Sequence, residues 1–128
     1  MDNVTGGVWY YKAPSKFLGN NSDVYGKSLK FDLKITPLTN MFKDKDVILE
    51  GGGLTIWYHT DKVPGTNWTS YSVTLKESGW KSGQFNAGKE VSSSDFKKVL
   101  ANMTALYIRG EYNSGADTGS MDNVKFGN

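Results

Sequence analysis

Aromatic side chains near the ends of predicted strands are the residues of this chain that best suit ligand binding. Trp57 and Tyr58 are adjacent, Trp68 follows a loop containing Pro and Gly, and Trp80 follows Ser and Gly. Tryptophan and tyrosine offer large, rigid surfaces with a polar group, and the apolar faces of sugar rings can stack on them. We therefore predict ligand contacts at Trp57, Tyr58, Trp68 and Trp80. The alternative is that these rings only cover the ends of a hydrophobic core.

An acidic segment near the end of the chain is a second candidate for chemistry. Asp117, Asp122 and Asn123 carry oxygen atoms of the kind that calcium prefers as ligands. The segment lacks the residue spacing of an EF-hand loop. The alternative is that its side chains form hydrogen bonds that shape a turn.

Catalytic chemistry has little support in this sequence. His59 is the only histidine, which excludes a metal site of three histidines, and no nucleophile motif accompanies it. We expect His59 to be a structural or surface residue at the end of a strand. Glutamates are present for glycoside hydrolysis, but nothing in the sequence pairs two of them across a cleft. With no cysteine, zinc-thiolate sites and cysteine nucleophiles are excluded as well. We predict no enzyme activity.

Composition limits the class of protein further. The 128 residues fit one domain, and no apolar run approaches the roughly 20 residues of a membrane span. The net charge of +2 comes from scattered residues of both signs, which is not typical of a nucleic-acid-binding protein. Polar and small residues follow Met1, so this sequence shows no signal peptide. We therefore expect neither nucleic acid as a partner nor membrane insertion.

The elements that must position these residues are mainly strands. Fifteen glycines and an aromatic content of 13% favour an all-β sandwich or barrel. Between positions 29 and 35, apolar and charged residues alternate with a period of two, which indicates a half-buried strand. Three consecutive glycines at 51–53 suit a bulge or a close backbone approach. We predict strands at 8–11, 29–35, 46–50, 54–59, 71–75, 104–112 and 121–126, with an irregular segment at 77–90 and a loop at 113–120.

One short helix is predicted near residues 93–101. Serines at 92–94 can cap its N-terminus, and Asp95 suits the positive end of the helix dipole. Phe96, Val99 and Leu100 follow at i, i+3 and i+4 and form one apolar face. Asn102 is the predicted end of the helix.

Several segments, in order along the chain, resemble the laminin B domain, also called laminin domain IV. They are APSKFLGN at 13–20, YGKSLKF at 25–31, DVILEG at 46–51, the segment at 95–109, and SMDNV at 120–124. Each motif is weak by itself, but their joint order over nearly the whole chain is specific. The segments at 6–11 and 109–119 look more like the bacterial branch of the family.

The resemblance implies one domain over residues 1–128: a jelly-roll-like β-sandwich of two antiparallel sheets with one short helix. It further implies a secreted, extracellular and non-catalytic role. Carbohydrate binding is our leading interpretation, with a glycan or polysaccharide as the partner. The alternative is a structural or adhesive protein–protein interaction module of a larger extracellular protein.

Two further expectations depend on this family and its structural relatives. Many jelly-roll carbohydrate-binding modules hold a structural calcium ion through an acidic residue near the last strand, and Asp122 and Asn123 occupy the matching positions. Such jelly rolls usually begin with one more strand ahead of this opening, so either the sequence omits that strand or the protein does without it. An unpaired sheet edge would then favour self-association.

Overall fold

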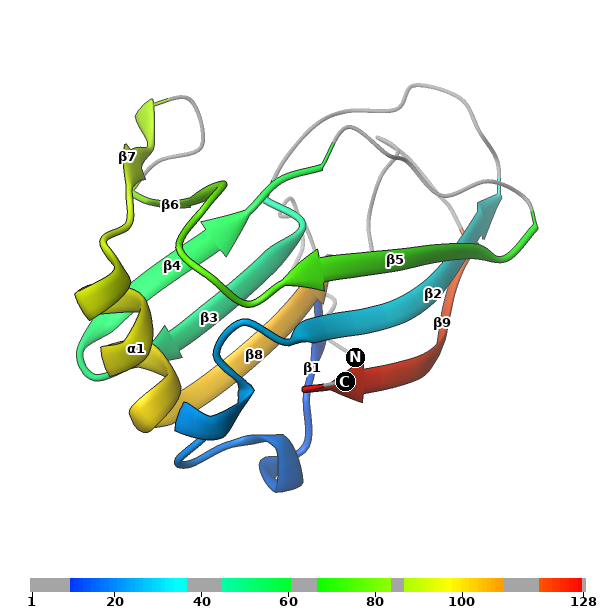
Figure 1. Ribbon diagram of the computed structural model, residues 1–128. Helices are drawn as coiled ribbons and strands as arrows, with labels where there is room; N and C mark the ends of the chain where they lie inside the picture. The colour runs from blue at the N-terminus through cyan, green and yellow to red at the C-terminus, as the bar shows by residue number, and fades with distance from the viewer. Residues whose placement is uncertain (1–9, 37–44, 61–66, 84–86, 110–117, 128) are drawn as a thin grey trace.

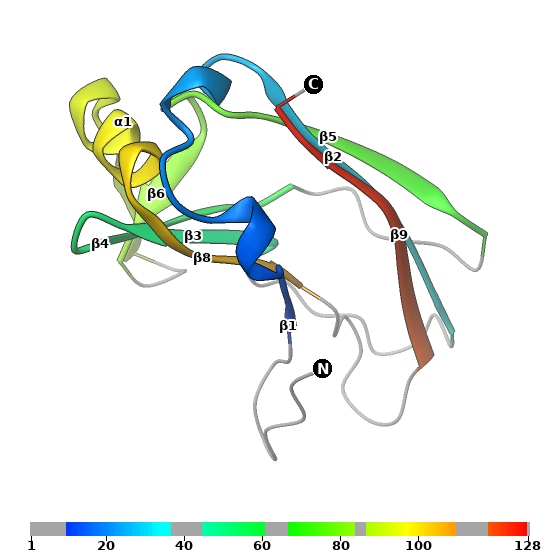
Figure 2. The same ribbon diagram turned by 90° about the horizontal axis from the view of Figure 1, so that it is seen from below.

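The computed structural model describes residues 10–36, 45–60, 67–83, 87–109 and 118–127, and it confirms the predicted all-β sandwich (Figure 1). Six strands form one antiparallel sheet in the order β1-β8-β3-β4-β6-β7, and three form a second in the order β5-β2-β9. Figure 2 shows the two sheets as separate layers, with helix α1 at one end. The strands are β1 Tyr10–Lys12, β2 Ser28–Thr36, β3 Val47–Gly51, β4 Leu54–Tyr58, β5 Thr69–Thr74, β6 Trp80–Ser82, β7 Lys89–Glu90, β8 Met103–Arg109 and β9 Thr118–Phe126.

Strand β2 shows how the sequence pattern produces the two layers. Leu29, Phe31 and Leu33 are almost fully buried between the sheets, whereas Lys30 is exposed on the opposite face. Because successive side chains point to opposite faces, the period-two pattern fixes which face meets the core. The stacked rings of Phe31 and Tyr71, 5.1 Å apart, join β2 to β5 within that core.

Helix α1 spans Ser93–Ala101, as the capping and periodicity predicted. The Ser92 hydroxyl accepts a hydrogen bond of 3.1 Å from the backbone N–H of Asp95. Phe96, Val99 and Leu100 are buried on one face of the helix. The segment before β2 forms two short 3-10 turns, η1 Ser15–Phe17 and η2 Ser22–Val24, and places Phe17 and Leu18 against the core.

Two regions differ from the sequence prediction. The segment expected to be irregular contains β6 and β7, which form because β6 pairs with β4 and β7 with β6. Strand β9 begins at Thr118 rather than at residue 121, because its pairing with β2 extends to Thr36. Non-local pairing decides both cases, and no local pattern announces it. The earlier part of the expected loop, 113–117, lies outside the described residues.

The glycines at 51–53 make the hairpin between β3 and β4, with positive φ angles of 58° at Gly52 and 78° at Gly53. Gly51 has a different role. A Cβ atom there would lie 2.5 Å from the backbone carbonyl oxygens of both Val99 and Asn102. The predicted close backbone approach is therefore found where β3 meets the end of α1.

Gly51→Ala should destabilise the domain by about 3 kcal/mol or more, at the upper end of overpacking penalties, because backbone rather than a flexible side chain must move. Gly53→Ala is the matched control, since no atom lies within 4 Å of its Cβ position. Its cost should be only the roughly 1–2 kcal/mol of a left-handed backbone conformation. Urea denaturation of both variants measures the difference. Equal losses of unfolding free energy in the two variants would mean that the backbone around Gly51 moves away from the new Cβ atom at little cost.

Candidate functional site

Trp80 is a core residue, so its prediction as a ligand contact is wrong. Its side chain is 0% exposed, and its indole N–H donates a hydrogen bond of 3.0 Å to the carbonyl of Thr74. The ring packs edge-on against Phe96, with centroids 5.2 Å apart. Pairing with Tyr58 fixes β6 so that this indole enters the core, where no ligand can reach it.

Trp57 is also buried and does not form part of a binding surface. It is 5% exposed, and its indole N–H donates a hydrogen bond of 2.8 Å to the carbonyl of Gly83. A Cβ at Gly88 would lie 2.6 Å from the indole ring, so Gly88 lies directly against it. Tyr58 is half-buried and packs on Trp80 at 5.5 Å. Of these two adjacent rings, only that of Tyr58 therefore keeps exposed surface.

Trp68 is the one predicted aromatic contact that the structure leaves largely accessible. It is 47% exposed and lies just before β5. The ammonium group of Lys34 lies 4.7 Å from the centroid of its ring, within range of a cation–π interaction. The four predicted aromatic residues thus do not form a single platform, and Trp68 and Tyr58 are the members with exposed surface.

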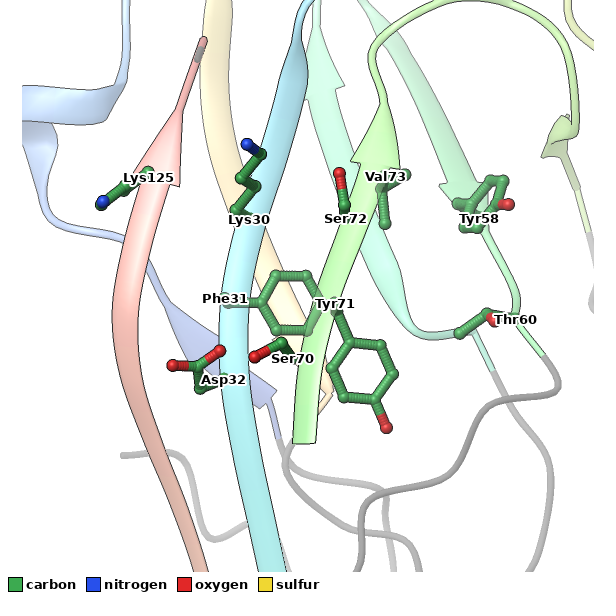
Figure 3. Close-up of a pocket in the computed structure, with 10 residues that line it drawn as sticks. All are labelled: Lys30, Phe31, Asp32, Tyr58, Thr60, Ser70, Tyr71, Ser72, Val73 and Lys125. Atoms are coloured by element: carbon green, nitrogen blue, oxygen red, sulfur yellow. The ribbon is translucent and has the colours of Figure 1, made fainter. Parts of the chain in front are cut away.

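A groove of about 660 Å³ lies over the three-stranded sheet and reaches past its edge strand β5. Figure 3 shows Lys125, Lys30 and Ser72 at one level across the strands, with Asp32 and Ser70 at the next. Sequence reasoning missed this site. Alternation on β2 places Lys30 and Asp32 outward, but their neighbours on β5 and β9 depend on a register that the sequence does not show. The lining residues are Lys30, Phe31, Asp32, Tyr58, Thr60, Ser70, Tyr71, Ser72, Val73 and Lys125.

A second groove, of about 440 Å³, lies over β1, β8 and β3 of the six-stranded sheet. Its lining combines the half-buried Tyr10, Ile48 and Tyr107 with the charged Lys12 and Glu50. The rings of Tyr10 and Tyr107 meet edge to face with centroids 6.4 Å apart. The groove therefore has an apolar floor with charged residues at its rim. This arrangement suits contact with another protein better than it suits catalysis.

Asp46 is the centre of a buried charge cluster that the sequence did not indicate. One of its carboxylate oxygens accepts a 2.7 Å hydrogen bond from the Thr60 N–H and lies 2.9 Å from Nδ1 of His59. The other lies 3.6 Å from Nε of Arg109, whose side chain is only 1% exposed. Burial raises the pKa of Asp46 above its ordinary value, although the Thr60 hydrogen bond, Arg109 and His59 act to lower it. Burial and the Asp46 charge also raise the pKa of Tyr71.

This cluster gives His59 a buried acidic partner. The residue follows the end of β4, as expected, and its Nδ1 lies 2.9 Å from the Asp46 carboxylate. The backbone N–H of Asp46 donates a hydrogen bond of 2.8 Å to the carbonyl of Tyr58, and the backbone N–H of Arg109 donates one of 2.8 Å to the carbonyl of Asp46. These bonds hold the backbone on both sides of Asp46 in place. The arrangement therefore supports a structural role for these charges.

The predicted calcium ligands are described only in part. Asp122 is exposed on β9 and lies opposite Asp32 of β2 in the register. Asp117 and the side chain of Asn123 lie outside the described part of the structure. Within that part, no group of three or more His, Cys, Asp or Glu side chains could hold a metal ion. A structural calcium ion at Asp122 stays a prediction.

Comparison with known proteins identifies relatives of this chain in both sequence and structure. The family model for Laminin B (Domain IV) matches residues 10–127. Laminin subunit gamma-2 of Equus caballus is 35% identical over 122 residues, and laminin subunit gamma-1 of Xenopus tropicalis is 31% identical over 122 residues. The L4b domain of human laminin alpha-2 superposes with a TM-score of 0.81 at 21% identity, covering 92% of this chain and 68% of that one.

The coverage of the relatives is unequal. The alignments span 90% of this chain but only 10% of the gamma-2 subunit and 7% of the gamma-1 subunit. Both relatives are animal proteins, and the expected similarity to the bacterial branch stays a prediction. Among the described residues, no helix is both long and apolar enough to cross a membrane. The match over residues 10–127 shows that the chain belongs to the laminin B (domain IV) family.

Proposed function

We propose that this chain is a non-catalytic structural and protein-interaction module of a larger extracellular protein. The observation that carries the proposal is its membership of the laminin B family over residues 10–127. The relatives are subunits of laminins, which are secreted structural proteins of the matrix, and the matched domain is a small part of each. A domain of this kind serves as a folded unit that contacts neighbouring domains or partner proteins.

The groove on the six-stranded sheet is the surface that best fits a protein partner. Tyr10, Ile48 and Tyr107 provide aromatic and aliphatic area that is only half-buried. Lys12 and Glu50 lie at its rim with opposite charges. Protein interfaces characteristically combine an apolar, aromatic-rich centre with a polar rim. This groove therefore supports contact with another folded protein.

Tyr107→Ser should weaken binding to such a partner roughly 30-fold, the effect of losing an aromatic hot spot worth about 2 kcal/mol. The measurement is surface plasmon resonance of the domain against purified laminins and basement membrane proteoglycan, with light scattering for self-association. Trp68→Ser is the matched control, because it removes an exposed ring next to β5 of the other sheet.

Equal weakening by both substitutions would place the interface elsewhere. Absence of any protein binding or self-association, with a folded domain, would contradict the interaction role. Tyr10→Ser provides a second probe of the same groove if Tyr107→Ser fails to fold.

Carbohydrate binding is a second candidate, favoured by a specific surface. The groove on the three-stranded sheet carries hydroxyl groups at Ser70 and Ser72 and an aromatic ring at Tyr58. Trp68 lies close to this face with almost half of its surface exposed. Hydroxyl, charged and aromatic groups on one concave surface can together hydrogen-bond and stack on sugars. In this proposal Trp68 and Tyr58 remain the aromatic ligand contacts.

A further inference from the structure

Two lysines lie directly opposite each other on the outer face of the three-stranded sheet. Lys30 of β2 pairs with Lys125 of β9 in the register, and Ser72 of β5 lies on the other side of Lys30. The Cβ atoms of directly opposed residues lie about 5 Å apart, and like charges at such positions are unfavourable. Neither ammonium group has an ion-pair partner among the residues that the structure describes. An anion bound between them would relieve the repulsion and gain two charge-assisted hydrogen bonds.

The next level of the same face has the opposite character. Asp32 of β2 lies opposite Asp122 of β9 and Ser70 of β5. This level lies about 7 Å further along the strand, which is two residues. Carboxylates accept hydrogen bonds from hydroxyl groups but repel phosphates. A nucleic acid has few hydroxyl groups between its phosphates and would meet repulsion one step from the lysines, whereas the rings of an acidic sugar carry hydroxyl groups between their charged groups and could turn these toward Asp32.

The groove provides room for a ligand of several rings. Its volume of about 660 Å³ lies within the range of roughly 300–1,000 Å³ that is typical of small-molecule sites. It runs from Lys125 across β2 and β5 to Tyr58 and Thr60 (Figure 3). The lysine pair thus lies toward one side of the groove and a tyrosine ring toward the other.

We propose that this groove binds an acidic oligosaccharide, with Lys30 and Lys125 holding a carboxylate or sulfate group of the sugar. Ser72 donates a hydrogen bond to the same acidic group, and Asp32 accepts hydrogen bonds from sugar hydroxyls one step along the strands. The inference rests on the carbohydrate-binding candidate and adds to it the class of sugar and the residues that select it.

The test uses calorimetric titration of the domain with three probes: polygalacturonate oligomers, heparin oligosaccharides and neutral xylo-oligosaccharides. Polygalacturonate carries carboxylate groups alone, whereas heparin carries sulfate groups in addition to carboxylates, so the comparison shows whether the site requires sulfate. The double variant Lys30→Gln/Lys125→Gln should weaken binding of the acidic probe at least about 10-fold. The double variant Lys89→Gln/Lys98→Gln removes the same charge from exposed positions outside the groove and should bind as the wild type does.

The outcomes separate this inference from the function on which it rests. Loss of acidic-probe binding in the groove variant, with retention in the control variant, supports the assignment. Equal weakening in both variants would mean that overall charge, not this site, attracts the sugar. Binding of the neutral probe alone, lost in Trp68→Ala, would overturn the acidic ligand and keep carbohydrate binding. If the folded domain binds none of the three probes, both the acidic-sugar inference and the carbohydrate-binding candidate are overturned.

Discussion

Replacing Trp80 with alanine should lower the free energy of unfolding by about 3–5 kcal/mol, the usual cost of removing a large aromatic residue from a core. The side chain is 0% exposed and is among the largest fully buried side chains described. It contacts Phe96 from α1 and Tyr58 from β4, so it joins the helix to the six-stranded sheet. Small domains are stable by only about 5–15 kcal/mol, and the variant should be poorly folded near body temperature.

Two comparison variants separate burial from other effects at Trp80. Trp80→Phe keeps most of the ring but leaves the Thr74 carbonyl without its 3.0 Å donor, at a cost of about 1–3 kcal/mol. Trp68→Ala removes an indole that is 47% exposed and should cost much less than Trp80→Ala. Urea denaturation followed by circular dichroism measures all three. Similar midpoints for Trp80→Ala and the wild type would show that Trp80 lies at the surface and would restore it as a ligand contact.

Removing the Asp46 carboxylate should have an effect of similar size. In Asp46→Ala, the side chain of Arg109, 1% exposed, loses its nearby anion, and the Thr60 N–H and His59 lose an acceptor. Breaking a buried pair by removing one partner typically costs about 3–5 kcal/mol. The double variant Asp46→Leu/Arg109→Met replaces both charges with apolar groups and should recover part of that loss. An Asp46→Ala variant as stable as the wild type would mean that water or a shift of neighbouring groups replaces the interaction that the Arg109 guanidinium loses.

The same carboxyl group should make stability depend on pH. Burial raises its pKa in the folded state, so the folded protein keeps this proton to a higher pH than the unfolded chain does. Stability from Asp46 is then fully present below the ordinary aspartate pKa of about 4, and it is lost as the pH rises through the raised value. The measurement is the difference in unfolding free energy between wild type and Asp46→Asn, followed from below the ordinary aspartate pKa upward in pH. The wild type should lose stability relative to the variant as the pH rises. A difference that grows in favour of the wild type with rising pH would show that the ion pair outweighs burial.

How far the sequence determined this protein can be followed through particular elements. The alternation in β2, with Leu29 and Phe31 inward and Lys30 outward, follows from the geometry of an extended chain alone. The helix at Ser93–Ala101 also depends on residues within one or two turns, namely the Ser92 cap and the face of Phe96 and Val99. Local signals of this kind, together with the order of the family motifs, were sufficient for the fold class and the family.

The candidate sites depended on contacts between distant segments. Whether a tryptophan near a strand end faces solvent or the core is set by what packs on it, and Trp57 and Trp80 are buried whereas Trp68 is 47% exposed. Asp46 and Arg109 lie far apart in the chain and meet because β3 pairs with β8. In the same way, Lys30 and Lys125 become neighbours only through the register of β2 with β9. The sequence by itself determined which residues alternate, which turn and which cap. Only the tertiary structure decided which of them meet, because strand register and side-chain burial are properties of the packed sheets and not of any one segment.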